Sequence, residues 1–325
     1  MNGEILNKVT GYTKKIKSEE KIMGKIKLRK QMVDILRYKL YGANGGLGAS
    51  RDDEKRAGTA GDKIFSMQTF KTYHQQVDHF ADWCKEHGIT GWDAARLAVS
   101  EYLKYLIEMD YAAPTIKTAA CALGKVWSCD YRDFGVVLPK CERVLITRSR
   151  QTVKRDAHFS IENNAELINF GACTGLRRAE LEHIVGTDLY EKDGKYYIHV
   201  RGKAVHAKGG KVRDVELIGN EKEIKAVVDR MLLAKDGLVW TIVHSSFDEH
   251  AQRNVYSWRV YNKYKRDLST LPREELYICR KDRAGERFDK AALEITSQFL
   301  GHGHYSDEKG KWIPRADITV RNYLH

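Results

Sequence analysis

The sequence predicts a mainly α-helical protein with a small β-sheet or hairpin, divided into a helical domain and a mixed α/β domain. The first observation is length, because 325 residues suffice for two domains and an extension. The second is a series of amphipathic helices between residues 66 and 126. The third is a pair of segments, 196–200 and 212–217, whose apolar and polar residues alternate as in the strands of a hairpin.

The composition is strongly basic. Lys and Arg number 56 against 44 Asp and Glu, which gives a net charge of +12 and an isoelectric point near 9.2. An excess of this size favours a polyanionic partner, most simply nucleic acid, although a basic protein without such a partner stays open. The 6 cysteines are scattered and form no Cys-x-x-Cys pair, so neither a zinc site nor a disulfide framework is predicted.

No apolar run in the sequence is long enough to span a bilayer, and residues 1–18 contain no apolar block of a signal peptide. The prediction is therefore a cytoplasmic protein with reduced cysteines and no membrane partner.

Residues 1–62 are predicted to form a basic N-terminal extension and linker. The part up to residue 41 has helical periodicity, with lysines crowding the face opposite its apolar residues. Those lysines are either a solvated helix face or an accessory DNA arm. The glycine-rich segment 42–48 and the polar segment 50–62 follow as a loop or linker.

Residues 63–135 are predicted to form the helical domain. A helix over 66–87 stops at Gly88, a second covers 93–109, and Pro114 opens a third. Residues 136–155 are polar and basic and are predicted to be the interdomain linker.

Residues 156–325 are predicted to form the mixed α/β domain. Helices are expected from Ser160 to residue 171, over 220–235, after His250, over 288–300 and over 315–324. The segment 303–307 is expected to be a polar loop.

The segment 172–181 is the most informative stretch of this domain. Gly175 permits a tight turn, and Arg177 follows at a helix start, where backbone N–H groups and an arginine together suit a phosphate. The alternative interpretation of Arg177 is a structural arginine paired with Glu180. Arg178 is interpreted as a solvated neighbour of Arg177.

The residues Thr174 to Leu181, Thr-Gly-Leu-Arg-x-x-Glu-Leu, resemble the first arginine motif of the tyrosine site-specific recombinases, the phage-integrase family. That family has four further motifs in fixed order: a hairpin lysine, His-x-x-Arg, Leu-Gly-His and a C-terminal tyrosine. This sequence has matching residues in that order, namely Lys203, His250 with Arg253, Leu300-Gly301-His302, and Tyr323.

The resemblance implies a helical core-binding (SAM-like) domain that clamps DNA and a tyrosine-recombinase catalytic domain. It implies that Arg177 and Arg253 bind the scissile phosphate, that His250 and His302 assist proton transfer, and that Tyr323 attacks phosphorus to leave a 3′-phosphotyrosine. Lys203 is the expected acid for the leaving oxygen. Alternatives within these roles stay open: Lys208 and Lys211 for the acid, and Tyr305 for the nucleophile. No cofactor and no metal are expected.

The resemblance also implies the partners. These are double-stranded DNA with specific recombination sites, a homotetramer on that DNA, and accessory DNA-bending or directionality factors. An integrase of a mobile element, bacterial or phage-encoded and nucleoid-associated, is expected. A type IB topoisomerase-like enzyme and a non-catalytic DNA-binding protein with the same fold are the alternatives.

Overall fold

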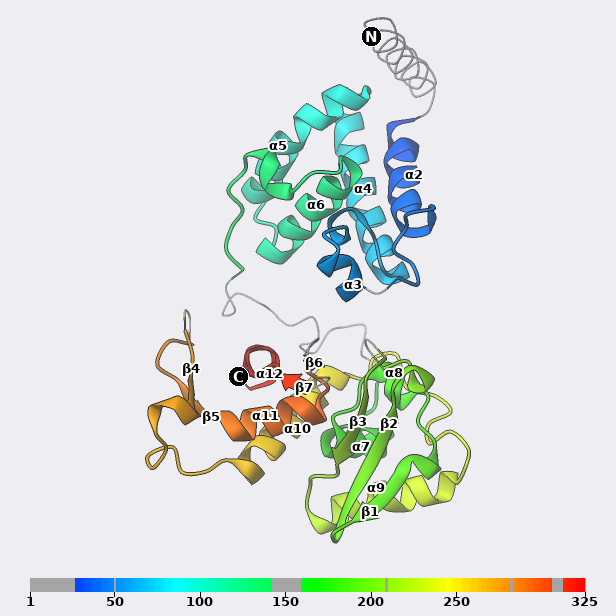
Figure 1. Cartoon of the computed structure of the whole chain (residues 1–325). Helices are drawn as coiled ribbons and strands as arrows, with labels where there is room; N and C mark the ends of the chain where they lie inside the picture. The colour runs from blue at the N-terminus through cyan, green and yellow to red at the C-terminus, as the bar shows by residue number, and fades with distance from the viewer. Residues whose placement is uncertain are drawn as a thin grey trace, which may run out of the picture. The chain divides into compact units, whose positions relative to one another are not determined.

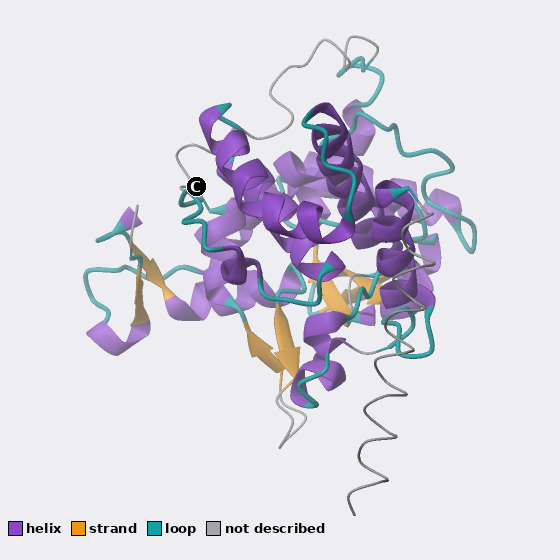
Figure 2. Cartoon of the chain, turned by 90° about the horizontal axis from the view of Figure 1, so that it is seen from above, coloured by secondary structure: helices purple, strands orange, loops and turns teal. Residues whose placement is uncertain are grey.

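The structure is a computed structural model, in which helices predominate and the strands are short (Figure 2). It describes residues 27–49, 51–141, 159–207, 210–280, 283–305 and 312–324. The chain divides into two compact units, Met1–Ile146 and Thr147–His325. This division falls within the expected linker 136–155. Within the described residues, no helix is both long and apolar enough to cross a membrane.

The first unit is helical (Figure 1). Its elements are α2 (Leu28–Tyr41), α3 (Arg51–Arg56), a 3-10 turn (Ala60–Asp62), α4 (Met67–Glu86), α5 (Trp92–Glu108), α6 (Ala113–Val126) and a second 3-10 turn (Tyr131–Phe134). Local chemistry sets their starts: Ser66 Oγ accepts a hydrogen bond of 3.1 Å from Thr69 N at the start of α4. Pro114 lies in the first turn of α6, where its missing N–H costs nothing.

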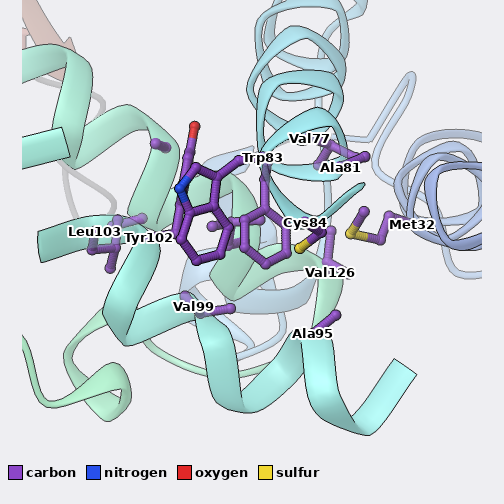
Figure 3. Packing of buried hydrophobic residues seen from close by; sticks show 14 of the residues in the cluster. Met32, Val77, Ala81, Trp83, Cys84, Ala95, Val99, Tyr102, Leu103 and Val126 are labelled. Atoms are coloured by element: carbon purple, nitrogen blue, oxygen red, sulfur yellow. The ribbon is translucent and has the colours of Figure 1, made fainter. Parts of the chain in front are cut away.

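One apolar core holds the first unit together (Figure 3). Met32 of α2 lies beside Val77 and Cys84 of α4, and Tyr102 of α5 and Val126 of α6 belong to the same cluster. The helix α2, which lies within the expected N-terminal extension, therefore packs its apolar face into this core. Residues 1–26, with most of the lysines of the expected DNA arm, lie outside the described residues.

The second unit contains a small antiparallel sheet, two short hairpins and the remaining helices (Figure 1). Its helices are α7 (Ala165–Thr174), α8 (Arg178–Leu181), α9 (Glu221–Ala234), α10 (Glu249–Tyr264), α11 (Lys290–Phe299) and α12 (Ala316–Tyr323). Its strands are β1 (Leu189–Lys192), β2 (Lys195–Arg201), β3 (Val212–Glu216), β4 (Leu276–Ile278), β5 (Arg287–Asp289), β6 (Gly303–Tyr305) and β7 (Trp312–Pro314). Its described residues also form 3-10 turns at Gly186–Asp188, Gly202–Val205 and Arg273–Glu275.

The sheet has the order β1-β2-β3, so the predicted hairpin of two strands gains a third strand, β1, that the sequence analysis missed. In its register Val200 lies opposite Arg213. Arg213 and Val215 are buried whereas Val212 and Asp214 are exposed, so Arg213 points to the buried face of the sheet.

Four local predictions were wrong. The segment 50–62, predicted to be a loop or linker, contains the helix α3 over Arg51–Arg56 and a 3-10 turn over Ala60–Asp62. The predicted helix over 288–300 begins only at Lys290, because Phe288 pairs with Tyr277 in a β4–β5 hairpin that the sequence did not predict. The predicted loop after His302 is partly strand, since Gly303 pairs with Pro314. The helix expected from Ser160 begins at Ala165, because Ser160 Oγ instead caps a preceding turn. Strands of three residues are too short for apolar alternation to reveal them.

Candidate functional site

Gly175 ends α7 in the left-handed conformation, with φ of 57°. A Cβ added here would overlap the ring of Tyr256, a fully buried residue of α10. Glycine is therefore required for both its backbone conformation and its lack of a side chain. The turn places Arg177 at the N-cap of α8 and presents the carbonyl of Gly175 to the guanidinium of Arg253.

Gly175→Ala is expected to destabilise the second unit more than Gly194→Ala, its matched control. Gly194 also has a positive φ, 70°, but an added Cβ there meets nothing within 4 Å. The control change should cost only the left-handed conformation, about 1–2 kcal/mol. Gly175→Ala should add about 1–3 kcal/mol of overpacking against Tyr256. Urea unfolding of both variants measures this, and equal losses would contradict the role assigned to the Tyr256 contact.

Glu180 is the centre of a buried ion cluster. It is 1% exposed and accepts hydrogen bonds from Arg213 Nη1 at 2.9 Å, Arg213 Nη2 at 2.7 Å and Arg177 Nη1 at 3.1 Å. Burial opposes its charge, but the neighbouring Arg213 and Arg177 outweigh burial and lower the pKa of Glu180 to about 2. Glu180 is therefore ionised and orients both arginines.

Arg177 and Arg253 converge on one backbone carbonyl. Their Nη2 atoms donate to Leu300 O at 3.0 Å and 3.1 Å, at the turn that precedes His302. Burial and the nearby charge of Arg253 lower the pKa of Arg177 to about 10, which still leaves it protonated at neutral pH. Two guanidinium groups held side by side in a region of low dielectric favour the binding of an anion between them.

Tyr323 lies against this cluster. Its side chain is 5% exposed, and its Oη accepts a hydrogen bond of 3.2 Å from Nε of the fully buried Arg253. The guanidinium carbon of Arg253 lies 5.1 Å from the centre of the Tyr323 ring. The structure therefore brings α10 and α12 together at the hydroxyl of a tyrosine.

Both histidines of the expected set contact Tyr323. His250 Nδ1 lies 3.5 Å from the Tyr323 Oη, and the imidazole is 65% exposed. The ring of His302 stacks on that of Tyr323 with centroids 5.2 Å apart, and its Nδ1 lies 3.2 Å from Thr319 Oγ1. Burial, together with the charges of Arg253 and its neighbours, lowers the pKa of His302 to about 2, so its imidazole is neutral.

The hairpin lysines are placed differently. Lys203 is exposed in the 3-10 turn after β2. Lys208 lies outside the described residues. Lys211 donates to Gly303 O, next to His302, and its charge contributes to the low pKa of His302. Of the two described lysines, Lys211 is the one that contacts the site.

Sequence reasoning missed three side chains of the site: Arg213, Thr319 and Arg178. The interpretation of Arg178 as a solvated neighbour of Arg177 was wrong. Its guanidinium donates to four backbone carbonyls of the loop that leads into α10, those of Val243, His244, Ser245 and Phe247, at distances of 3.3, 3.1, 3.3 and 2.8 Å. Arg178 thereby joins the loop before His250 to the helix after Arg177.

Within the described residues, no group of three or more His, Cys, Asp and Glu side chains is arranged to hold a metal ion. The cluster is instead formed by arginines, neutral or exposed imidazoles and one phenol, all contributed by the second unit.

The helical unit followed by a mixed α/β unit has the fold of the tyrosine recombinases, as a comparison with solved structures shows. No family profile and no curated protein matches the chain. A solved structure of the XerH site-specific recombinase, bound to its difH substrate in a pre-cleavage complex, is similar with a TM-score of 0.50 and 16% identity. The match covers 92% of this chain and 93% of XerH.

The Tn1549 transposon integrase, residues 82–397 in complex with circular intermediate DNA, is a second similar structure. Its TM-score is 0.44 with 11% identity, over 84% of this chain and 93% of that chain. The resemblance to XerH confirms the fold expected from the sequence, a mainly helical chain with a core-binding and a catalytic domain.

Proposed function

We propose that this chain is a site-specific DNA recombinase, the integrase of a mobile element, that cuts and rejoins DNA through a 3′-phosphotyrosine. The observation that carries the proposal is the position of the Tyr323 Oη, 3.2 Å from Arg253 Nε and 3.5 Å from His250 Nδ1. A hydroxyl held beside a cation and an imidazole has the partners that a nucleophile needs for attack on a phosphodiester.

In the proposed reaction, Tyr323 Oη forms a bond to phosphorus and the bond from phosphorus to the 5′ oxygen breaks. Arg177 and Arg253 bind the non-bridging oxygens, whose negative charge increases in the transition state. An arginine suits this role because its planar fork binds two oxygens and keeps its charge. The covalent link conserves the bond energy, so the 5′ hydroxyl of another strand can attack it and release the tyrosine.

Two proton transfers accompany the proposed cleavage. His250 is the candidate acceptor of the Tyr323 proton, since its ring nitrogen faces the hydroxyl. Neutral His302 holds the Tyr323 ring by stacking and is the second imidazole proposed to bind the phosphate. A lysine of the β2–β3 hairpin gives the second proton to the leaving 5′ oxygen, with Lys203, Lys208 and Lys211 as candidates.

The proposed partners are double-stranded DNA with specific recombination sites, a homotetramer of this chain on the DNA, and accessory bending or directionality factors. The net charge of +12 supports a polyanionic partner. XerH, the similar protein, was solved in complex with its DNA substrate.

Covalent trapping tests the proposal. The probe is a duplex selected by the protein from a randomised pool and then nicked beside the cleaved position, so that the short leaving fragment diffuses away. We expect a protein–DNA adduct that survives denaturation, and four-way junctions when intact paired sites are supplied. Binding without any adduct would support a non-catalytic DNA-binding protein, and an adduct without junctions would support a topoisomerase-like enzyme.

The hairpin lysines are compared by replacing Lys203, Lys208 and Lys211 singly with Ala. The variant that lacks the acid should cleave an ordinary substrate about 10²–10⁴-fold more slowly, as expected for loss of general acid catalysis. It should recover on a substrate whose leaving 5′ oxygen is replaced by sulfur, because a thiolate leaves without protonation. The contact of Lys211 with Gly303 supports Lys211 as a candidate beside Lys203. If none of the three variants regains its cleavage rate on the sulfur substrate, the general acid is not a lysine of this hairpin.

A further inference from the structure

The helix that carries Tyr323 is short. Helix α12 spans 8 residues, Ala316–Tyr323, and a helix of this length is not stable in water by itself. Its position therefore depends on the surfaces against which it packs. Thr319 and Tyr323, one turn apart, face His302 and Arg253. Val320 and Leu324, also one turn apart, lie on a neighbouring face of the helix and belong to a separate apolar cluster.

This second cluster is made by the β4–β5 hairpin and its neighbours. Besides Val320 and Leu324, its buried members are Tyr261, Cys279, Phe288, Ala292 and Leu293. Val320 is 4% exposed and Leu324 is 0% exposed. The hairpin thus covers the face of α12 that carries Val320 and Leu324.

Arg283, in the loop of this hairpin, binds the C-terminal end of α12 directly. Its Nη1 donates to Val320 O at 3.0 Å and to Leu324 O at 2.6 Å. The last carbonyls of a helix have no donor within the helix, and a cation there also interacts favourably with the helix dipole. The Arg283 guanidinium is itself held by Glu286, through Nε at 2.8 Å, and lies 5.4 Å from the centre of the Phe288 ring.

The base of the hairpin is fixed to α10, the helix that carries Arg253. Tyr261 of α10 accepts a hydrogen bond of 3.0 Å from Asp289 N at its hydroxyl. Arg266, just after α10, donates to Asp289 Oδ1 at 2.6 Å and from its backbone N to Oδ2 at 2.9 Å. The hairpin therefore connects the end of α12 to the helix that holds the arginine partner of Tyr323.

We propose that Arg283 is a positioning residue for Tyr323: with the β4–β5 cluster it holds α12 so that the tyrosine hydroxyl stays beside Arg253 and His250. The role in cleavage rests on the function proposed above. The docking of α12 itself is a property of the fold and is measurable without any activity.

The test compares Arg283→Met and Arg283→Lys with Arg287→Met in the full chain. Arg283→Met keeps an apolar stem over Phe288 but removes the donors to the carbonyls, whereas Arg283→Lys keeps the charge and can reach one of the carbonyls. Arg287 is an exposed residue of β5 in the same hairpin, so its replacement makes the same change in charge away from α12. Amide hydrogen exchange measures opening of α12, α10 and α11 separately.

We expect Arg283→Met to raise exchange in α12 by about tenfold, the size expected for lost charged hydrogen bonds, with little change in α10 and α11. Arg283→Lys should be intermediate and Arg287→Met unchanged. Equal protection of the α12 amides from hydrogen exchange in Arg283→Met and Arg287→Met would overturn the role of Arg283 in docking α12. A rise spread evenly over α10, α11 and α12 would overturn it as well, because it would show general destabilisation.

The second measurement is the rate constant of adduct formation at saturating nicked duplex. Arg283→Met should lower this rate constant about tenfold, with DNA affinity within about twofold of the unmodified protein and partial recovery in Arg283→Lys. Weaker DNA affinity with an unchanged saturated rate would overturn the positioning role in cleavage. If the unmodified protein forms no adduct, the proposed function fails, while hydrogen exchange still decides the docking of α12.

Discussion

Tyr323→Phe is expected to abolish the covalent protein–DNA adduct while leaving DNA binding intact. The change removes only the hydroxyl, which is the nucleophile of the proposed reaction, and keeps the ring that stacks on His302. Loss of an enzyme nucleophile lowers the rate by orders of magnitude, so adduct yield should fall by about 10³ or more. Denaturing electrophoresis of the reaction on the nicked duplex measures the adduct, and peptide mapping of the trapped complex locates it.

The control is Tyr305→Phe, since Tyr305 is the other tyrosine that follows His302 closely in the sequence. This variant should form the adduct at the rate of the unmodified protein. An adduct mapped to Tyr305, or one that persists in Tyr323→Phe, would refute the assignment of the nucleophile. Tyr323→Phe should also lose some stability, about 1–3 kcal/mol, because the fully buried Arg253 Nε loses its acceptor.

Glu180→Ala is expected to give the largest loss of stability. The carboxylate is 1% exposed and accepts three side-chain hydrogen bonds and one backbone hydrogen bond from two arginines, of which Arg213 is itself buried. Removing one partner of a buried ion pair leaves an uncompensated charge and typically costs about 3–5 kcal/mol. Glu182→Ala is the matched control, since Glu182 is 41% exposed and lies 3.9 Å from Arg178. Its replacement should cost less than about 1 kcal/mol.

The dependence of the free energy of unfolding on pH, in the acid range, provides a second test of Glu180. Its pKa is about 2 in the folded chain, below the ordinary value of 4.5, so folding favours the ionised form. The resulting stabilisation is fully present above pH 4.5 and is lost as the pH falls towards 2. The stability difference between the unmodified protein and Glu180→Gln should therefore shrink between these pH values. Urea unfolding at pH 7 and at a series of lower pH values measures this difference, and a constant difference would contradict an ionised Glu180.

The position of Arg213 in its strand is a sequence feature from which part of the buried arginine cluster can be predicted. Arg213 lies two residues before Val215 in a segment predicted to be a strand, so both side chains point to the same face of the strand, and Val215 is buried. A charged residue at an inward position requires a buried partner. The sequence could therefore have predicted a buried ion pair for Arg213, although the partner Glu180, 33 residues away, could not be identified from periodicity.

The elements that depend on neighbouring residues could be predicted from the sequence. Apolar periodicity and caps predicted α2, α4, α5 and α6 of the first unit but not the short α3, and alternation predicted β2 and β3. The glycine turn at Gly175 predicted that Arg177 lies at a helix start. The order of the motifs predicted the recombinase fold that the comparison with XerH confirms. These features follow from backbone conformation and local side-chain spacing, which the sequence states directly.

Which distant residues meet depends on the tertiary packing. Arg177 and Leu300 are 123 positions apart, Arg253 and Tyr323 are 70 apart, and Arg283 reaches the end of α12 from a hairpin of two three-residue strands. No periodicity encodes such contacts, because each depends on how separate helices and strands pack around a shared core. The hydroxyl of Tyr323 therefore lies beside Arg253 and His250 only when α10, α11 and α12 are packed together.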